Sequence, residues 1–91
     1  MRSLFCHQTA AERENRKRIK LCVYAFAYEF ENTSLVPDAQ FDEMARSVDL
    51  SIVTKHQEWW RKEFNPSTGQ WIHTHPNLQG IRSLYATHYD S

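Results

Sequence analysis

Residues 28–42, YEFENTSLVPDAQFD, decide the fold of this chain. The hydroxyls of Thr33 and Ser34 compete for backbone groups inside a helix, and Pro37 disfavours helical backbone in the residue before it. A helix that enters this stretch must therefore end within it. Asp38 follows where an N-cap belongs, its carboxylate accepting from the exposed amides of a second helix. The stretch predicts a helical hairpin, two helices joined by a short link.

The first helix of this hairpin is predicted over about 10 to 31. Thr9 and Glu12 have the spacing of a capping box, which marks its start. Apolar residues then recur every three or four positions and predict one buried stripe: Ile19, Cys22, Val23, Phe26, Ala27 and Phe30. The charged residues predicted for the exposed side are Glu12, Arg13, Glu14, Arg16, Lys17 and Lys20.

The second helix is predicted to begin after Asp38, with a buried side made by Phe41, Met44, Ala45 and Val48. Residues 49–54 break this pattern. They fit either a short extended link or a start in which Asp49 or Ser51 caps the next helix, and the pattern does not separate these alternatives.

A third helix is predicted over residues 55–64, with large aromatic anchors at Trp59, Trp60 and Phe64. Residues 65–69, NPSTG, predict a turn, after which Trp71 and Ile72 return the chain to the core. A final helix is predicted to start at residues 75–76 with Pro76 in its first turn. Its apolar stripe is Leu78, Ile81, Leu84 and Tyr85.

The composition fits one all-α domain over residues 1–91, with the hairpin at about 9–50 and a helical extension at about 51–90. Two Gly and three Pro among 91 residues argue against a β-rich or disordered chain. No apolar run approaches the ~20 residues of a membrane span, and residues 1–6 lack the apolar core of a secretion signal. We expect a cytoplasmic protein that makes no membrane contact, with an irregular lead-in at residues 1–8 and Cys22 as a buried, reduced thiol.

Tyr28, Asp38 and Asp42 carry a family resemblance. A Tyr separated by nine residues from Asp-Ala-Gln-Phe-Asp resembles the N-terminal Ia domain of bacterial NAD-dependent DNA ligases over about residues 18–50. That family has a His where Glu29 stands and a Tyr where Phe41 stands. The resemblance implies binding of the nicotinamide mononucleotide half of NAD. A free-standing domain of this type is also similar to small ligase-related proteins of bacteriophages, which implies a bacterial host cell as its location.

We expect no catalysis, because the chain has no Gly-rich loop of the kind that binds phosphate and no recognisable nucleophile–base pair. Three binding functions remain as expectations. The first is a protein-binding module that meets a host or phage partner, as a host-takeover or anti-defence factor. Its expected surface is acidic, with one exposed Trp: Glu29, Glu31, Asp42, Glu43 and either Trp59 or Trp60. The second is a site for nicotinamide mononucleotide or NAD, with no cofactor required otherwise: Tyr28, Glu29, Asp38, Phe41 and Asp42. The third is a DNA-binding module that uses a basic helix face: Arg13, Arg16, Lys17, Arg18 and Lys20.

Residues 73–76, HTHP, resemble the His-x-His-Pro core of JAMM metalloproteases. Ala86 stands where that family places its metal-binding aspartate. Two His are also fewer than the three protein ligands of a usual catalytic zinc site. We therefore expect no metal at His73 and His75.

Overall fold

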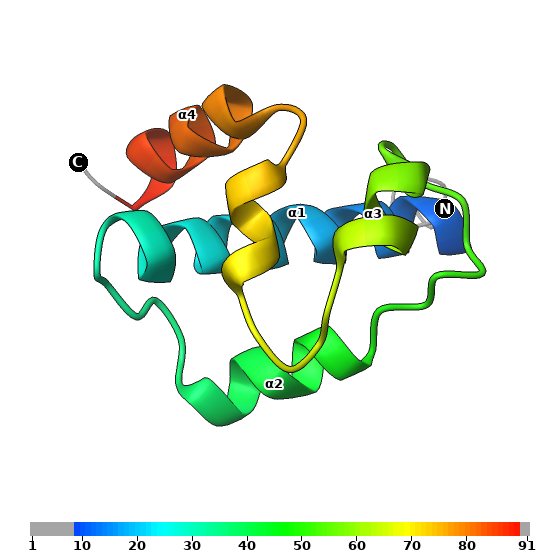
Figure 1. Ribbon diagram of the computed structural model, residues 1–91, viewed down its shortest axis with the longest axis horizontal. Helices are drawn as coiled ribbons and strands as arrows, with labels where there is room; N and C mark the ends of the chain where they lie inside the picture. The colour runs from blue at the N-terminus through cyan, green and yellow to red at the C-terminus, as the bar shows by residue number, and fades with distance from the viewer. Residues whose placement is uncertain (1–8, 90–91) are drawn as a thin grey trace, which may run out of the picture.

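The computed structural model describes residues 9–89, and every regular element in that range is helical. The elements are α1 (Ala10–Phe30), α2 (Asp38–Arg46), α3 (Gln57–Glu63), the 3₁₀ helix η2 (Gln70–Thr74) and α4 (Leu78–His88). Helix α1 is the central element, with α4 along one side, α2 along the other and η2 crossing it (Figure 1). The all-α prediction is confirmed. The predicted lead-in at residues 1–8 lies outside the described residues.

Helix α1 begins and ends close to where the sequence predicts. The Thr9 hydroxyl accepts from the backbone N–H of Glu12 at 3.1 Å, and the Glu12 carboxylate accepts from the backbone N–H of Thr9 at 2.8 Å, so the capping box is confirmed. At the other end Asn32 adopts left-handed backbone with φ 53°, which Asn tolerates better than most residues. The Thr33 N–H then returns to the Ala27 carbonyl at 2.9 Å and closes the helix.

Helices α1 and α2 run antiparallel and form the predicted hairpin, joined by residues 31–37 (Figure 1). The prediction that Asp38 is the N-cap is wrong by one position. Pro37 has extended backbone and occupies the cap, and its carbonyl accepts from the N–H groups of Gln40 and Phe41, both at 3.0 Å. Asp38 is the first helical residue and its side chain makes no capping bond, so its carboxylate stays available for other contacts.

A buried ion pair between Glu14 and Arg18 fixes the link between α2 and α3. Their side chains are 4 % and 1 % exposed, and Arg18 Nε donates to Glu14 Oε2 at 2.9 Å. Arg18 also donates to Thr54 Oγ1 (2.6 Å), Gln57 Oε1 (2.9 Å) and the carbonyls of Asp49 (2.7 Å) and Ile52 (3.1 Å). The predictions that Glu14 lies on the exposed side and that Arg18 belongs to a basic surface are therefore wrong.

Residues 49–54 form an irregular link in which Asp49 caps no helix. Its carboxylate instead accepts from the backbone and hydroxyl of Ser51 at 3.0 and 2.6 Å. Helix α3 starts at Gln57, two residues later than predicted, because His56 before it has left-handed backbone with φ 61°.

The turn at residues 65–69 is confirmed, with the Asn65 side chain accepting from the Ser67 N–H at 2.9 Å. Trp71 and Ile72 of η2 are buried, as expected. Pro76 does not lie in the first turn of α4. Asn77 is the N-cap, and its side chain accepts from the Gly80 N–H at 3.2 Å.

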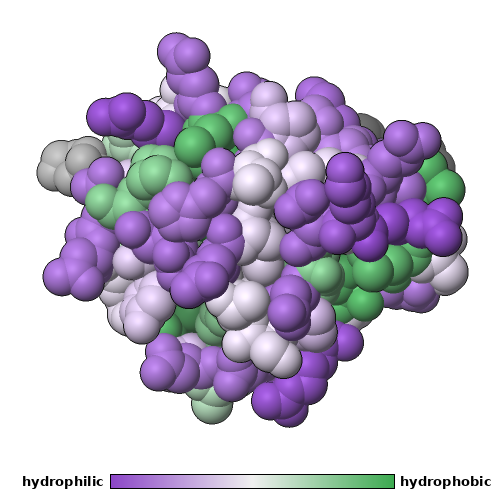
Figure 2. Space-filling view, viewed as in Figure 1, coloured by the Kyte–Doolittle hydropathy of each residue, from purple (hydrophilic) through white to green (hydrophobic). Residues whose placement is uncertain are grey.

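The core follows α1 on several sides rather than along one stripe. Leu21 and Ala25 are buried although they lie outside the predicted stripe, whereas Ile19 and Phe30 at its edges are 38 % and 41 % exposed. The predicted α2 side is fully buried only at Ala45. On the face in Figure 2, hydrophobic side chains form separate small patches among polar ones. No helix within residues 9–89 combines the length and the hydropathy that crossing a bilayer requires.

Candidate functional site

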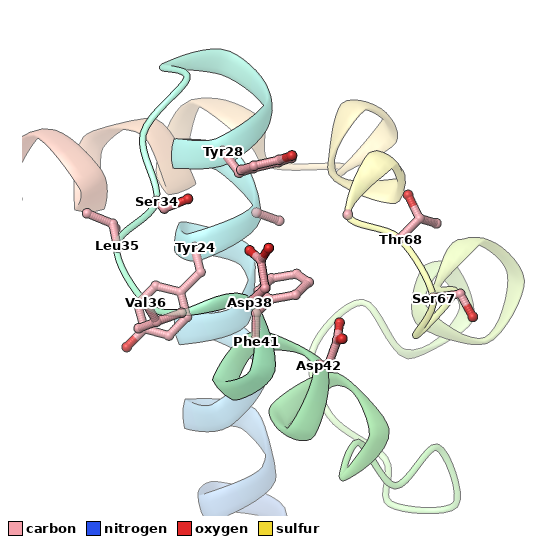
Figure 3. Close-up of a pocket in the computed structure, with 12 residues that line it drawn as sticks. Tyr24, Tyr28, Ser34, Leu35, Val36, Asp38, Phe41, Asp42, Ser67 and Thr68 are labelled. Atoms are coloured by element: carbon pink, nitrogen blue, oxygen red, sulfur yellow. The ribbon is translucent and has the colours of Figure 1, made fainter.

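A surface hollow lies at the bend of the hairpin, where the sequence predicts a binding site. Its volume is about 240 Å³. Side chains from α1, from α2 and from the turn before η2 surround it (Figure 3). We call it the hairpin hollow, and its lining residues are Tyr24, Ala25, Tyr28, Ser34, Leu35, Val36, Asp38, Phe41, Asp42, Ser67, Thr68 and Gly69. The structure therefore brings together four of the five predicted ligand-binding residues.

Aromatic side chains supply one part of the hollow. Tyr28 is 58 % exposed and extends from α1 toward the loop that carries Thr68 (Figure 3). The Phe41 ring is partly buried against the core, and a Cβ added at Gly69 would lie 3.6 Å from it. Burial raises the pKa of the Tyr24 hydroxyl, and the neighbouring Tyr89 raises it further. The hollow thus offers aromatic surface, and the Tyr24 hydroxyl remains protonated at neutral pH.

Two carboxylates give the hollow its charge. Asp38 and Asp42 lie one helical turn apart on α2, and the hollow lies beside both (Figure 3). No Lys, Arg or His is among the described residues that line it. The Asp42 carboxylate lies 3.8 Å from the Arg46 guanidinium, but both side chains are at least half exposed, so this pair is weak. Aromatic surface beside two carboxylates, of which Asp42 is weakly paired with Arg46, favours a flat, cationic ligand group.

Glu29 does not belong to the hollow. Its Oε1 lies 2.9 Å from His73 Nε2 of η2, and its side chain is only 18 % exposed. Glu29, which stands where the ligase family has a His, therefore adds no carboxylate to the lining. Conversely, the predicted site did not include Tyr24, Ser67 and Thr68. Tyr24 lies one helical turn before Tyr28 on α1, so helical spacing could have identified it. Ser67 and Thr68 lie in the lining because the turn before η2 packs beside the hairpin.

The residues predicted to meet a protein partner are scattered. Trp60 is 2 % exposed, so it is no exposed anchor. Trp59 is partly exposed, as expected for one of the pair, but its indole N–H donates to Thr74 Oγ1 at 3.0 Å and its ring packs against Trp71. Glu31 and Glu43 are both exposed. All the predicted basic residues lie on α1, and all but the buried Arg18 line one surface hollow. Arg13, Arg16 and Lys20 are exposed, and Lys17 is partly buried.

The two predicted metal-ligand candidates point to different partners. His73 pairs with Glu29, and the His75 Nδ1 accepts from the Asn77 backbone N–H at 2.9 Å. Burial and the nearby His56 lower the pKa of His75 to about 4. Within residues 9–89, no three His, Cys, Asp or Glu side chains are grouped so that they could hold a metal ion.

Comparison of the chain with protein-family models, with curated proteins and with solved structures finds no match.

Proposed function

We propose that this protein is a small binding module whose hairpin hollow holds the nicotinamide ring of nicotinamide mononucleotide or of NAD. The observation that carries the proposal is the meeting of Tyr28, Asp38 and Asp42 around one hollow that no Lys, Arg or His of residues 9–89 lines. In the oxidised cofactor the nicotinamide ring is flat and positively charged. The face of Tyr28 and the two carboxylates each attract such a ring.

The size of the hollow limits what it can enclose. Its 240 Å³ fall below the range of about 300–1,000 Å³ that is usual for pockets of drug-sized ligands. We therefore expect it to hold the ring and its sugar, with the Ser34 hydroxyl near the ribose, and with the Thr68 hydroxyl able to donate to it while it accepts from the Gln70 N–H at 3.1 Å. A phosphate would extend outside, where Arg46 beside Asp42 is one cation that can meet it.

Isothermal titration calorimetry with nicotinamide mononucleotide and with NAD tests this proposal. We expect Tyr28→Ala and Asp42→Asn each to weaken binding by about 5- to 30-fold, since each removes an interaction worth about 1–2 kcal/mol. Glu43→Gln is the matched control, because it removes one negative charge from the exposed side of the same helix, outside the hollow. No heat of binding at millimolar ligand, or wild-type affinity in both variants, would refute the proposal.

A second candidate function uses the same hollow for a protein partner. Tyr28 is 58 % exposed, so its ring is accessible to a partner protein. An Arg or Lys side chain of that partner would carry the positive charge that the hollow favours. In this alternative a host or phage protein inserts a cationic side chain between Tyr28, Asp38 and Asp42. A pull-down from bacterial lysate should then recover one partner with the wild-type protein and lose it with an Asp38→Asn, Asp42→Asn variant. Recovery of no partner, or equal recovery with both proteins, counts against this alternative.

A further inference from the structure

The N-terminal half of α1 presents a second surface, separate from the hairpin hollow. Four cationic side chains on it line a surface hollow of about 250 Å³ together with Met44 of α2. We call these four the basic face: Arg13, Arg16, Lys17 and Lys20. They recur at spacings of three and four residues, which places them on one side of the helix. No carboxylate is among the described residues that line this hollow.

The two carboxylates nearby in the sequence each lie close to one member of the basic face, Glu12 to Arg16 and Glu14 to Lys17. Glu12 is engaged in the capping box with Thr9. Glu14 is buried, and although burial disfavours its charged form, hydrogen bonds from Lys17 and Arg18 lower its pKa, so it stays ionised. Residues 10–20 carry five cationic and two anionic side chains, an excess of three positive charges. This excess attracts a polyanion.

Part of the basic face is held in place before any ligand arrives. Lys17 Nζ donates to the Ser47 carbonyl at 2.7 Å and lies 2.8 Å from Glu14 Oε1. It therefore links α1 to the end of α2 and has little conformational freedom left to lose on binding. Arg13, Arg16 and Lys20 project around this fixed ammonium group as exposed side chains.

We propose that the basic face binds the sugar–phosphate backbone of a nucleic acid. Arg13 and Lys20 are separated by a rise of about 10 Å along the helix. One strand of a duplex presents a phosphate about every 3.4 Å along its axis, so this distance spans about three phosphates. The planar guanidinium group of an arginine can donate two parallel hydrogen bonds to the oxygens of one phosphate. The contact requires no base recognition and is independent of the hairpin hollow.

A membrane surface fits these observations less well. A helix that lies on a bilayer needs a broad apolar face beside its charged face. The apolar side of α1 is covered by α4 and η2, and among the described residues Met44 is the single apolar one that lines the hollow at the basic face. Binding to anionic lipid is therefore an outcome that would contradict the proposal.

Fluorescence anisotropy with a labelled 20-base-pair DNA duplex tests it. For about three to four neutralised phosphates, we expect affinity to fall by about 40- to 150-fold between 50 and 200 mM salt. In an Arg16→Ala, Lys20→Ala variant the slope of log affinity against log salt should become shallower by about two units. These side chains are exposed, and circular dichroism and thermal unfolding will verify that the variant is folded.

The matched control is Arg61→Ala, Lys62→Ala, which removes two exposed positive charges from α3 and leaves the same net charge. It should retain the wild-type salt slope. An equal loss of affinity in both double variants would overturn the proposal, because any positive charge would then serve. Tighter binding to vesicles of anionic phospholipid than to the duplex, or equal competition by polyglutamate, would overturn it as well.

Discussion

Arg18→Ala is the substitution that the fold should tolerate least. Arg18 makes five hydrogen bonds, to Glu14, to the side chains of Thr54 and Gln57 and to two backbone carbonyls. Its guanidinium carbon also lies 5.3 Å from the centroid of the Trp60 ring. Its removal leaves Glu14 buried with only Lys17 as a cationic partner.

The expected cost is about 3–5 kcal/mol, the range measured when one partner of a buried pair is removed. A domain of this size has a total stability of only about 5–14 kcal/mol. At about 4 °C or more per kcal/mol, the midpoint of thermal unfolding should fall by at least about 12 °C. Substitution of both charges by apolar residues should not restore stability, because the carbonyls of Asp49 and Ile52 would still lose their donor.

Urea unfolding followed by tryptophan fluorescence measures this loss, with Trp60 as a reporter next to the substituted site. Arg16→Ala, on the exposed part of the same helix, is the control and should change the free energy of unfolding by less than about 0.5 kcal/mol. A loss below about 1 kcal/mol in Arg18→Ala would refute the reasoning, since the link between α2 and α3 would then not depend on this side chain.

Three further predictions concern single side chains. His75 has a folded-state pKa of about 4, below its unfolded value of about 6.5. As the pH falls from about 6.5 toward 4, the unfolded state therefore binds a proton more readily than the folded state, and the free energy of unfolding declines. After allowance for its partial exposure, this loss is on the order of 1–2 kcal/mol, and His75→Asn should make thermal stability less dependent on pH across that window. Burial raises the pKa of the Cys22 thiol, so in a Cys6→Ser background a thiol reagent should react only after denaturation. Thr9→Ala removes a confirmed helix cap and should lower the free energy of unfolding by about 1 kcal/mol in urea titrations.

The sequence predicts the helices well because their signals are local. The Thr9 capping box and the break before Pro37 each act within a few residues, and both appear in the structure. The prediction fails where burial depends on distant chain segments. Helical periodicity assigns charged residues to the surface, and nothing in the spacing of Glu14 and Arg18 shows that a loop more than 30 residues away supplies their partners.

The same distinction holds for the candidate site. Tyr28, Asp38 and Asp42 lie on either side of one short link, so the hairpin alone brings them together. Ser67 and Thr68 reach the hollow only because the chain returns to α1 through the turn before η2. Glu29, adjacent to Tyr28 in the sequence, lies on another side of α1 and meets His73 there, because neighbouring helical residues do not share a face.

The hairpin hollow should prefer a cationic ring to a neutral one, and reduction of the ligand tests this preference. Nicotinamide mononucleotide carries a positive, aromatic ring, whereas its reduced form has the same sugar and phosphate with a neutral ring. Calorimetric titration at one ionic strength should show about 5- to 30-fold tighter binding of the oxidised form, since the interaction of a cation with an aromatic ring contributes about 1–2 kcal/mol. Equal affinity for the two forms, or preference for the reduced one, would contradict the claim that Tyr28, Asp38 and Asp42 select a cationic ring.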